Sequence, residues 1–412
     1  MIANKIDARI VINALKNGGV PKEFIEDIII GRDMEISEFR RNLNNLNDGI
    51  GNIKIILGNY GTGKTFLLNA LKNIALKDDF VVSFLQIDRV FRLNKLDDFY
   101  YYIMHNLYVK NNNGLTSFDN IFDIWIDNLK NAPDKMESTN EINKVIKTMQ
   151  KYNDTFARAL LNYIRSKIKN NYEMTEVISS WLSGEKNISY EMKTKFNVIG
   201  SINKSNMIDF LKAFSKLVDL LGYKGFVIAI DEIDLLLNER SDIRKNAYEN
   251  LKYLIDLIVV GDLTKTMLLL SGTKEIVENE EKGFRSNIAL SQRLGNAIDS
   301  YESGIGNIKE SIIMLKDIKF TDYLEITDKI VNIYKYAYDI HIKATAESLK
   351  NWVLYTYNKN GKNIQELKIR EFITRLITIL EQVDENHIYN SNLEFKMNGD
   401  RPIFKNMLSK SN

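Results

Sequence analysis

The chain contains no cysteine, and only three prolines and three histidines occur among its 412 residues. The absence of cysteine excludes disulfides, zinc–thiolate sites and thiol catalysis. The histidines His105, His341 and His387 are far apart and lack ligand spacing, which argues against a histidine metal site or a catalytic triad. No long apolar run occurs, and the first residues lack the apolar core of a signal peptide. We therefore expect a cytoplasmic protein with no membrane partner.

The chain also lacks an excess of charge of one sign. It has 56 Lys and Arg against 54 Asp and Glu, a net charge of +2, so no strong overall field attracts nucleic acid or anionic lipid. A hydrophobic content of 44% with 27% charged residues is ordinary for a globular protein. The length suits two or three domains.

The clearest chemical signal is a glycine-rich loop. An apolar run from Ile53 to Leu57 leads into Gly-x-x-x-x-Gly-Lys-Thr and then into a helix-forming segment, the order typical of a phosphate-binding loop. Its glycines allow backbone N–H groups to turn toward a phosphate, and the following helix adds donors and a positive dipole end. Lys64 is expected to contact the β- and γ-phosphates of ATP, and the Thr65 hydroxyl to bind Mg²⁺. The residues expected to bind the nucleotide here are Gly58, Asn59, Tyr60, Gly61, Thr62, Gly63, Lys64, Thr65 and Phe66.

A second motif supplies two carboxylates. Five apolar residues, Phe226 to Ile230, run into Asp231 and Glu232, which is typical of a buried parallel strand that delivers acids to its carboxyl end. Asp231 is expected to hold Mg²⁺, and Glu232 to act as the base that polarises the attacking water. Together the two motifs predict an ATPase.

Further apolar runs at 80–86, 266–273 and 311–315 complete a predicted parallel sheet, so the fold class is α/β. We expect an N-terminal helical segment at 1–48, an ATPase core at 49–315, a helical lid domain at 316–390 and a polar tail at 391–412. Helical patterns at about 110–205 predict an insertion in the core between the two motifs. The tail is expected to be partly disordered or bound to a partner.

The order of these motifs resembles that of AAA+ ATPases. The resemblance implies a three-layer P-loop core with a parallel sheet, and a polar "sensor 1" residue at Ser271 or Thr273, of which we favour Thr273. It implies an arginine finger acting on a neighbouring subunit, with Arg293 favoured and Arg285 competing, and hence a homo-oligomer. It also implies a "sensor 2" arginine in the lid, Arg370 or its neighbour Arg375.

Residues 29–35, which include Gly31 and Arg32, resemble the entry motif of the initiator and origin-recognition branch, where this stretch lines the adenine. Gly31 and Arg32 are accordingly expected to flank the base.

A broader resemblance is to the ATP-binding proteins of BREX-type bacteriophage-exclusion systems. It rests on the segment before Pro21, on the phosphate loop, and on the stretches around Asp231, Ser271 and Arg293, and it covers roughly 8–100 and 223–385. It implies a prokaryotic antiphage ATPase that is partnered with a helicase or another defence protein.

Three functions are compatible with these features. The first is an ATPase that acts on duplex DNA or remodels a DNA-bound partner in antiphage defence. The second is an ATP-gated DNA loader or assembly platform with slow hydrolysis. The third is a signalling scaffold whose helical insertion senses a phage component.

Overall fold

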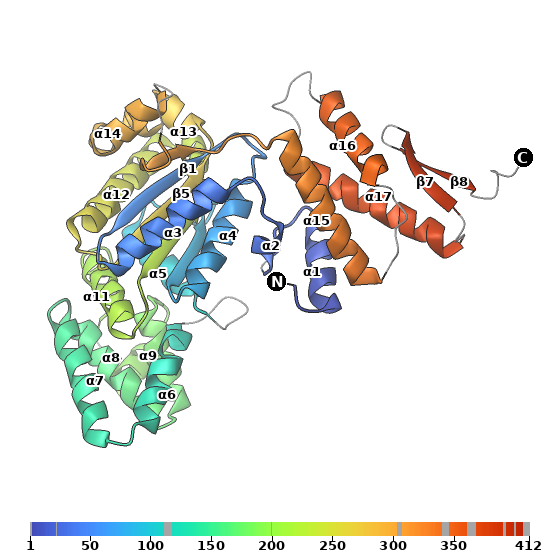
Figure 1. Ribbon diagram of the computed structural model, residues 1–412. Coiled ribbons are helices and arrows are strands. Elements are labelled where there is room, and N and C mark those ends of the chain that lie inside the picture. The colour runs from blue at the N-terminus through green and yellow to red at the C-terminus, as the bar shows by residue number, and fades with distance from the viewer. Residues whose placement is uncertain are drawn as a thin grey trace, which may run out of the picture. The chain divides into compact units, whose positions relative to one another are not determined.

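The computed structural model describes residues 2–21, 23–110, 118–198, 200–302, 307–339, 346–360, 368–389, 393–398 and 401–406 (Figure 1). The chain forms two compact units. The helical unit comprises Met1–Ile36, Gly58–Asn73 and Leu315–Asn412, and the sheet unit comprises Ser37–Leu57 and Ile74–Met314.

The sheet unit is built on six strands in the order β3-β2-β4-β5-β1-β6. All neighbours pair in parallel except β2 and β3. The expectation of a parallel sheet is therefore corrected to a mixed, mostly parallel one. The antiparallel strand has only two residues, too few for an apolar run to reveal it. The strands are β1 (Asn52–Leu57), β2 (Val81–Gln86), β3 (Leu107–Tyr108), β4 (Phe226–Asp231), β5 (Thr266–Gly272) and β6 (Ile312–Met314).

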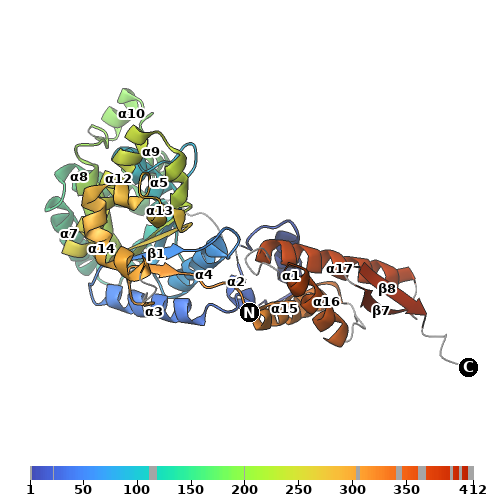
Figure 2. The same ribbon diagram turned by 90° about the horizontal axis from the view of Figure 1, so that it is seen from above.

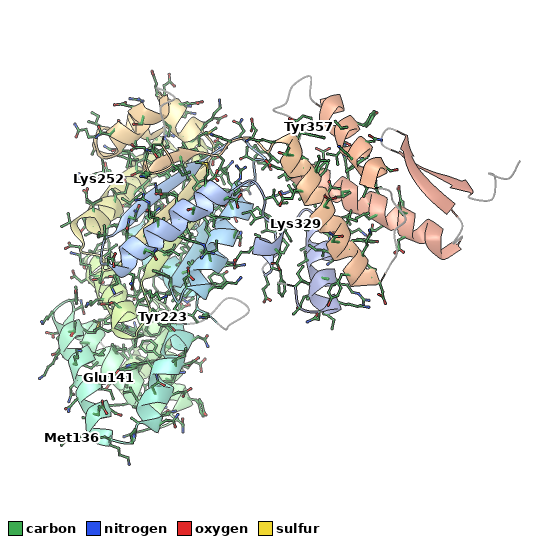
Figure 3. All side chains as sticks on the ribbon, viewed as in Figure 1. Met136, Glu141, Tyr223, Lys252, Lys329 and Tyr357 are labelled. Carbon is green, nitrogen blue, oxygen red and sulfur yellow. The ribbon has the colours of Figure 1, made fainter. Side chains whose placement is uncertain are left out.

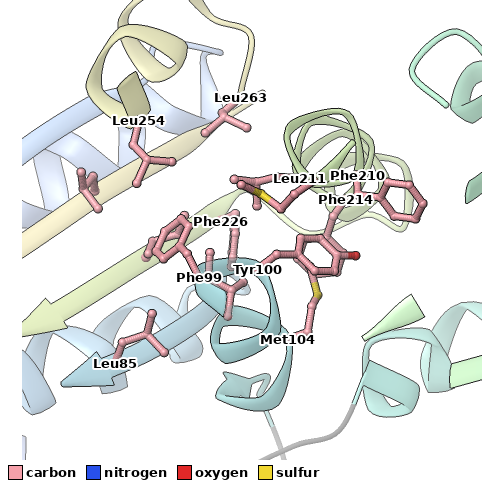
Figure 4. Close-up of a cluster of buried hydrophobic side chains, with 14 of the residues drawn as sticks. Leu85, Phe99, Tyr100, Met104, Phe210, Leu211, Phe214, Phe226, Leu254 and Leu263 are labelled. Atoms are coloured by element: carbon pink, nitrogen blue, oxygen red, sulfur yellow. The ribbon is translucent and has the colours of Figure 1, made fainter. Parts of the chain in front are cut away.

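Strands β4 and β5 are buried along their whole length, as their continuous apolar runs predict. Helix α12 (Ser241–Val260) packs on β1 and β5, and α5 (Leu96–His105) packs on β2. Between α5, α11 (Met207–Leu220) and the sheet lies a core that includes Phe99, Phe214 and Phe226 (Figure 4). This core fixes the sheet from which the candidate site residues project.

Helices fill the chain between β3 and β4 in the sheet unit. They are η1 (Phe118–Phe122), α6 (Asp123–Asn131), α7 (Lys135–Gln150), α8 (Asp154–Ile168), α9 (Tyr172–Leu182) and α10 (Tyr190–Lys195), followed by α11. Trp125 donates a hydrogen bond from Nε1 to Glu141. Tyr223 donates from its hydroxyl to the carbonyl of Ile121 at 3.1 Å. Glu141 and Tyr223 are labelled in Figure 3. Trp125 and Trp181 are both buried, so these aromatics serve packing.

After β5 the sheet unit continues with α13 (Glu275–Glu278), η3 (Phe284–Ser286) and α14 (Ile288–Glu302). Between β4 and α12 lies η2 (Ile233–Asn238). Helix α3 (Asp33–Asn47) precedes β1, and α4 (Lys64–Lys77) follows the glycine-rich loop.

The helical unit joins the two ends of the sequence. Helix α1 (Lys5–Lys16) packs on α15 (Phe320–Tyr338) and α17 (Ile369–Tyr389) through Ala8, Val11, Ile12 and Leu15, which recur at helical spacing. The short α2 (Ile25–Ile28) and α16 (Ala346–Asn360) both contact α15 (Figure 2). Trp352 of α16 stacks on Phe372 of α17 with ring centroids 5.1 Å apart.

The end of the chain differs from the expected polar tail. Strands β7 (Leu393–Asn398) and β8 (Arg401–Asn406) form an antiparallel hairpin that contacts α16 and α17. Apolar and polar residues alternate in Leu-Glu-Phe-Lys-Met-Asn, and Gly-Asp follows as a typical hairpin turn pair. These features are a hairpin signal within a segment whose overall composition is polar. Gly361, expected to interrupt the lid helices, lies outside the described residues.

No helix in the described parts of the chain combines the length and the apolarity that crossing a membrane requires.

Candidate functional site

The glycine-rich loop lies in the helical unit and runs from Gly58, which follows β1, to Thr65 in the first turn of α4. Gly61 and Gly63 have φ of 91° and 88°, in the left-handed region that favours glycine. The Lys64 ammonium donates to the carbonyls of Gly58 and Asn59 at 2.9 and 3.0 Å. The lysine is thus folded back over its own loop, where its charge suits an anionic ligand.

Gly31 and Arg32 precede α3 in the same unit. Gly31 has a φ of 67°, and a Cβ there would lie 2.8 Å from Oδ2 of Asp322, so no other residue fits without strain. Arg32 is 4% exposed and donates to the carbonyls of Thr62 and Lys316, both at 2.8 Å. Its guanidinium therefore contacts the glycine-rich loop itself; its expected place beside the adenine stays a prediction.

The resemblance implies that Arg370 or Arg375 reaches the nucleotide, but at the start of α17 the basic side chain that lies against the glycine-rich loop is Lys368. Arg370 is exposed and its side chain lies against Gly18, while Arg375 pairs with Glu371 at 2.6 Å. Lys368, just before α17, has its Nζ 5.0 Å from the centre of the Tyr60 ring.

The stem of Lys368 also covers the loop, since a Cβ at Gly61 would lie 2.9 Å from its Cγ. The resemblance implies an arginine at this helix start, so the sequence does not point to Lys368. The "sensor 2" role of Arg370 stays a prediction.

In the sheet unit, two carboxylates stand at the end of β4. Asp231 is 2% exposed, and its Oδ1 accepts from the Glu232 backbone N–H at 2.9 Å and from the Ser271 hydroxyl. Glu232 has a φ of 59°, a left-handed conformation that costs a glutamate of the order of 1–3 kcal/mol. Its Oε2 accepts from Nε2 of Gln86 at 2.8 Å.

The register of the sheet explains this grouping. Gln86 of β2 is opposite Asp231, Ile230 is opposite Leu270 of β5, and Leu57 of β1 is opposite Gly272. Since all these strands run parallel, their carboxyl ends meet at one edge, where open α/β sheets bind ligands.

The two "sensor 1" candidates have different partners. Ser271 is fully buried and its hydroxyl contacts Asp231, whereas Thr273 donates its backbone N–H to Oδ1 of Asp234 at 2.9 Å. The hydroxyl in contact with a site carboxylate is therefore that of Ser271; the favoured role of Thr273 is a prediction still. Asp234 and Gln86 were missed, although each lies close in sequence to a predicted strand end.

Both candidate arginine fingers form ion pairs within the chain. Arg293 contacts Asp256 at 2.5 Å, and Arg285 contacts Asp299 at 3.4 Å. Burial acts to raise the pKa of Asp256, but the hydrogen bond from Lys252, labelled in Figure 3, and the charge of Arg293 hold that pKa below its ordinary value. Whether Arg293 reaches a neighbouring subunit stays a prediction.

A comparison with models of known protein families gives one match. A family model described as BREX system ATP-binding protein BrxC/D matches residues 3–398. No curated protein matches the chain.

Proposed function

Since the chain belongs to the BREX system ATP-binding protein family of phage-defence proteins, we propose that it hydrolyses ATP and acts on DNA or remodels a DNA-bound partner. The observation that carries the hydrolytic part is the carboxylate pair at the end of β4. Asp231 accepts a hydrogen bond from the Ser271 hydroxyl, and Glu232 accepts one from the Gln86 amide. Leu57, the residue before the glycine-rich loop, belongs to the same sheet edge.

Each residue then has a chemical role. Lys64 would bind the β- and γ-phosphates as a compact charge. The side chains whose oxygens would suit Mg²⁺ are the Thr65 hydroxyl in the helical unit and the Asp231 carboxylate in the sheet unit. Bound Mg²⁺ neutralises negative charge on the phosphate oxygens. Glu232 accepts a hydrogen bond, and then a proton, from the water that attacks the γ-phosphate. The oxygen ligands and the loop that carries Lys64 fit this cation and this nucleotide.

The ion pair between Arg293 and Asp256 favours a second candidate function. If Arg293 serves a neighbouring subunit, it must first leave Asp256, to which it is bound within its own chain. Hydrolysis would then be slow until a homo-oligomer assembles, as expected of an ATP-gated loader or assembly platform on DNA.

The test is ATP hydrolysis by the purified protein with Mg²⁺, with and without duplex DNA and over a range of protein concentrations. Turnover that rises with DNA supports a DNA-coupled ATPase. Turnover per subunit that rises with protein concentration supports assembly through Arg293. Tight ATP binding without turnover under all these conditions would overturn the proposed hydrolysis.

The hydrogen bond from Gln86 is predicted to restrain Glu232 as a general base. The Gln86 amide donates a hydrogen bond to Oε2 of Glu232, so the attacking water must compete with this amide for that oxygen. Replacing Gln86 by Ala is expected to raise kcat about threefold, which corresponds to the net value of a modest hydrogen bond, and to leave KM for ATP unchanged. Steady-state kinetics measure this. A fall in kcat would mean instead that Gln86 holds Glu232 in its productive position.

A further inference from the structure

Arg32 joins three separate segments of the helical unit. Its Nη2 donates to the Thr62 carbonyl in the glycine-rich loop, and its Nη1 donates to the carbonyl of Lys316, just before α15. Glu35 lies 3.6 Å from Nη1. Burial lowers the pKa of Arg32, against the opposing charges of Glu35, Asp322 and Asp317. An arginine remains protonated in proteins, so this is a buried, charged fork.

Two features suit arginine at this place. A guanidinium has several donors in one plane and can serve two carbonyls at once, whereas the compact ammonium of a lysine cannot hold the same two directions. Gly31 allows the chain to turn sharply just before Arg32, with Asp322 packed against it. The Asp322 carboxylate in turn accepts from the backbone N–H of Lys319 at 2.9 Å, at the start of α15.

The bond to Thr62 has a consequence for the loop. The peptide group between Thr62 and Gly63 is planar and trans, so its C=O and N–H point in opposite directions. Holding the Thr62 carbonyl toward Arg32 therefore directs the Gly63 N–H away from Arg32. Gly63 itself adopts a φ of 88°, and apart from its two chain neighbours no atom of the described residues lies within 4 Å of its Cβ position, so that side of Gly63 is open.

We propose that Arg32 is a positioning residue of the phosphate site: it fixes the Thr62–Gly63 peptide, and with it a backbone donor for the phosphate chain of the nucleotide. This inference rests on the proposed function, since it concerns the same phosphate site. A positioning role for Arg32 differs from a role beside the adenine, because it predicts an effect on the binding of any polyphosphate, with or without a base.

The experiment compares Mg·ATP with inorganic tripolyphosphate, both in the presence of Mg²⁺, by titration calorimetry. Arg32→Lys is expected to weaken both ligands by the same factor, about tenfold or more, as expected for the loss of a hydrogen bond from a charged group. Loss of ATP binding with unchanged tripolyphosphate binding would overturn the proposal and favour the adenine. Unchanged binding of both ligands would overturn it as well.

The matched control is Arg9→Lys. Arg9 also donates from its guanidinium to a backbone carbonyl of this unit, that of Ala337 at 2.9 Å, and within the described residues it shows no hydrogen bond to the loop. Arg9→Lys should leave the affinities for Mg·ATP and tripolyphosphate unchanged. Like Arg32→Lys, it can lower thermal stability by weakening a bond from a guanidinium to a backbone carbonyl. If Arg32→Lys does not fold, Glu35→Gln replaces it, because it removes the negative charge nearest to Nη1 and keeps the side-chain size.

Glu35→Gln is expected to weaken both ligands equally and by less than Arg32→Lys; an effect on ATP alone would again count against the proposal. Binding measurements on the wild type distinguish a failure of the proposed function from a failure of the proposed role of Arg32. If it binds neither ATP nor tripolyphosphate, the proposed function fails; if it binds both and the variants match it, only the role of Arg32 fails.

Discussion

Replacing Glu232 by Gln is expected to lower kcat for ATP hydrolysis by about a hundredfold or more while ATP still binds. A glutamine keeps the size of the side chain and can still meet Gln86, but it has no carboxylate to accept a proton from water. The left-handed backbone at this position is as accessible to glutamine as to glutamate, so the turn after β4 should persist. Steady-state kinetics and a separate measurement of ATP affinity distinguish the two effects.

The matched control for this variant is Glu239→Gln. Glu239 follows η2, seven positions further along the chain, and its carboxylate pairs with Arg92 at 3.2 Å. The control should hydrolyse ATP at nearly the wild-type rate. Equal rates for wild type and Glu232→Gln would show that Glu232 is not the base. A loss of both binding and turnover would indicate that the turn, rather than the chemistry, depends on the carboxylate.

The local parts of the site could be predicted from the sequence because each is a short, continuous motif. The run into Gly58 and the run into Asp231 each combine a buried strand with the residues that follow it directly. Buried parallel strands are recognisable since they are apolar on both faces. The two-residue β3 was missed, because two residues are too few to form a recognisable apolar run.

The partners of these motifs were harder to predict, since they come from distant positions. Gln86 meets Glu232 across 146 positions, and Arg32 meets Lys316 across 284. The first pairing depends on which strands are neighbours and in what register, which local patterns do not specify. The second depends on how the two ends of the chain pack in the helical unit. The signal in the sequence for Gln86 is that it is a polar residue at the end of an apolar strand.

The choice between Ser271 and Thr273 illustrates the limit of periodicity. Both hydroxyls belong to the apolar run expected at 266–273, and of the two Thr273 is the favoured candidate. In the structure the strand extends to Gly272, and Ser271, opposite Ile56 in the register, carries the hydroxyl that meets Asp231.

Replacing Lys64 by Ala is expected to weaken ATP binding by about ten- to hundredfold, because the variant loses a charged donor to the phosphates. The ammonium now rests on the Gly58 and Asn59 carbonyls, and a ligand phosphate offers it a stronger, oppositely charged partner. The measurement is thermal unfolding with and without Mg·ATP. A ligand at a hundred times its Kd stabilises a protein by about 2.7 kcal/mol. At that concentration Lys64→Ala would be at only about one to ten times its own Kd, so it should gain about 0.4–1.4 kcal/mol, clearly less than the wild type.

The control for Lys64→Ala is Lys77→Ala, at the last residue of the same helix. It removes the same charge from the same element, about 3.6 turns from Lys64, and should keep the full stabilisation by Mg·ATP. If Lys64→Ala gains as much stability as the wild type, the lysine does not contact the phosphates. If the nucleotide stabilises neither variant nor the wild type, the glycine-rich loop does not bind ATP under these conditions, and the assignment of Glu232 loses its substrate. Binding by Lys64 and proton acceptance by Glu232 are therefore separable: the first variant should lose affinity, and the second should lose turnover alone.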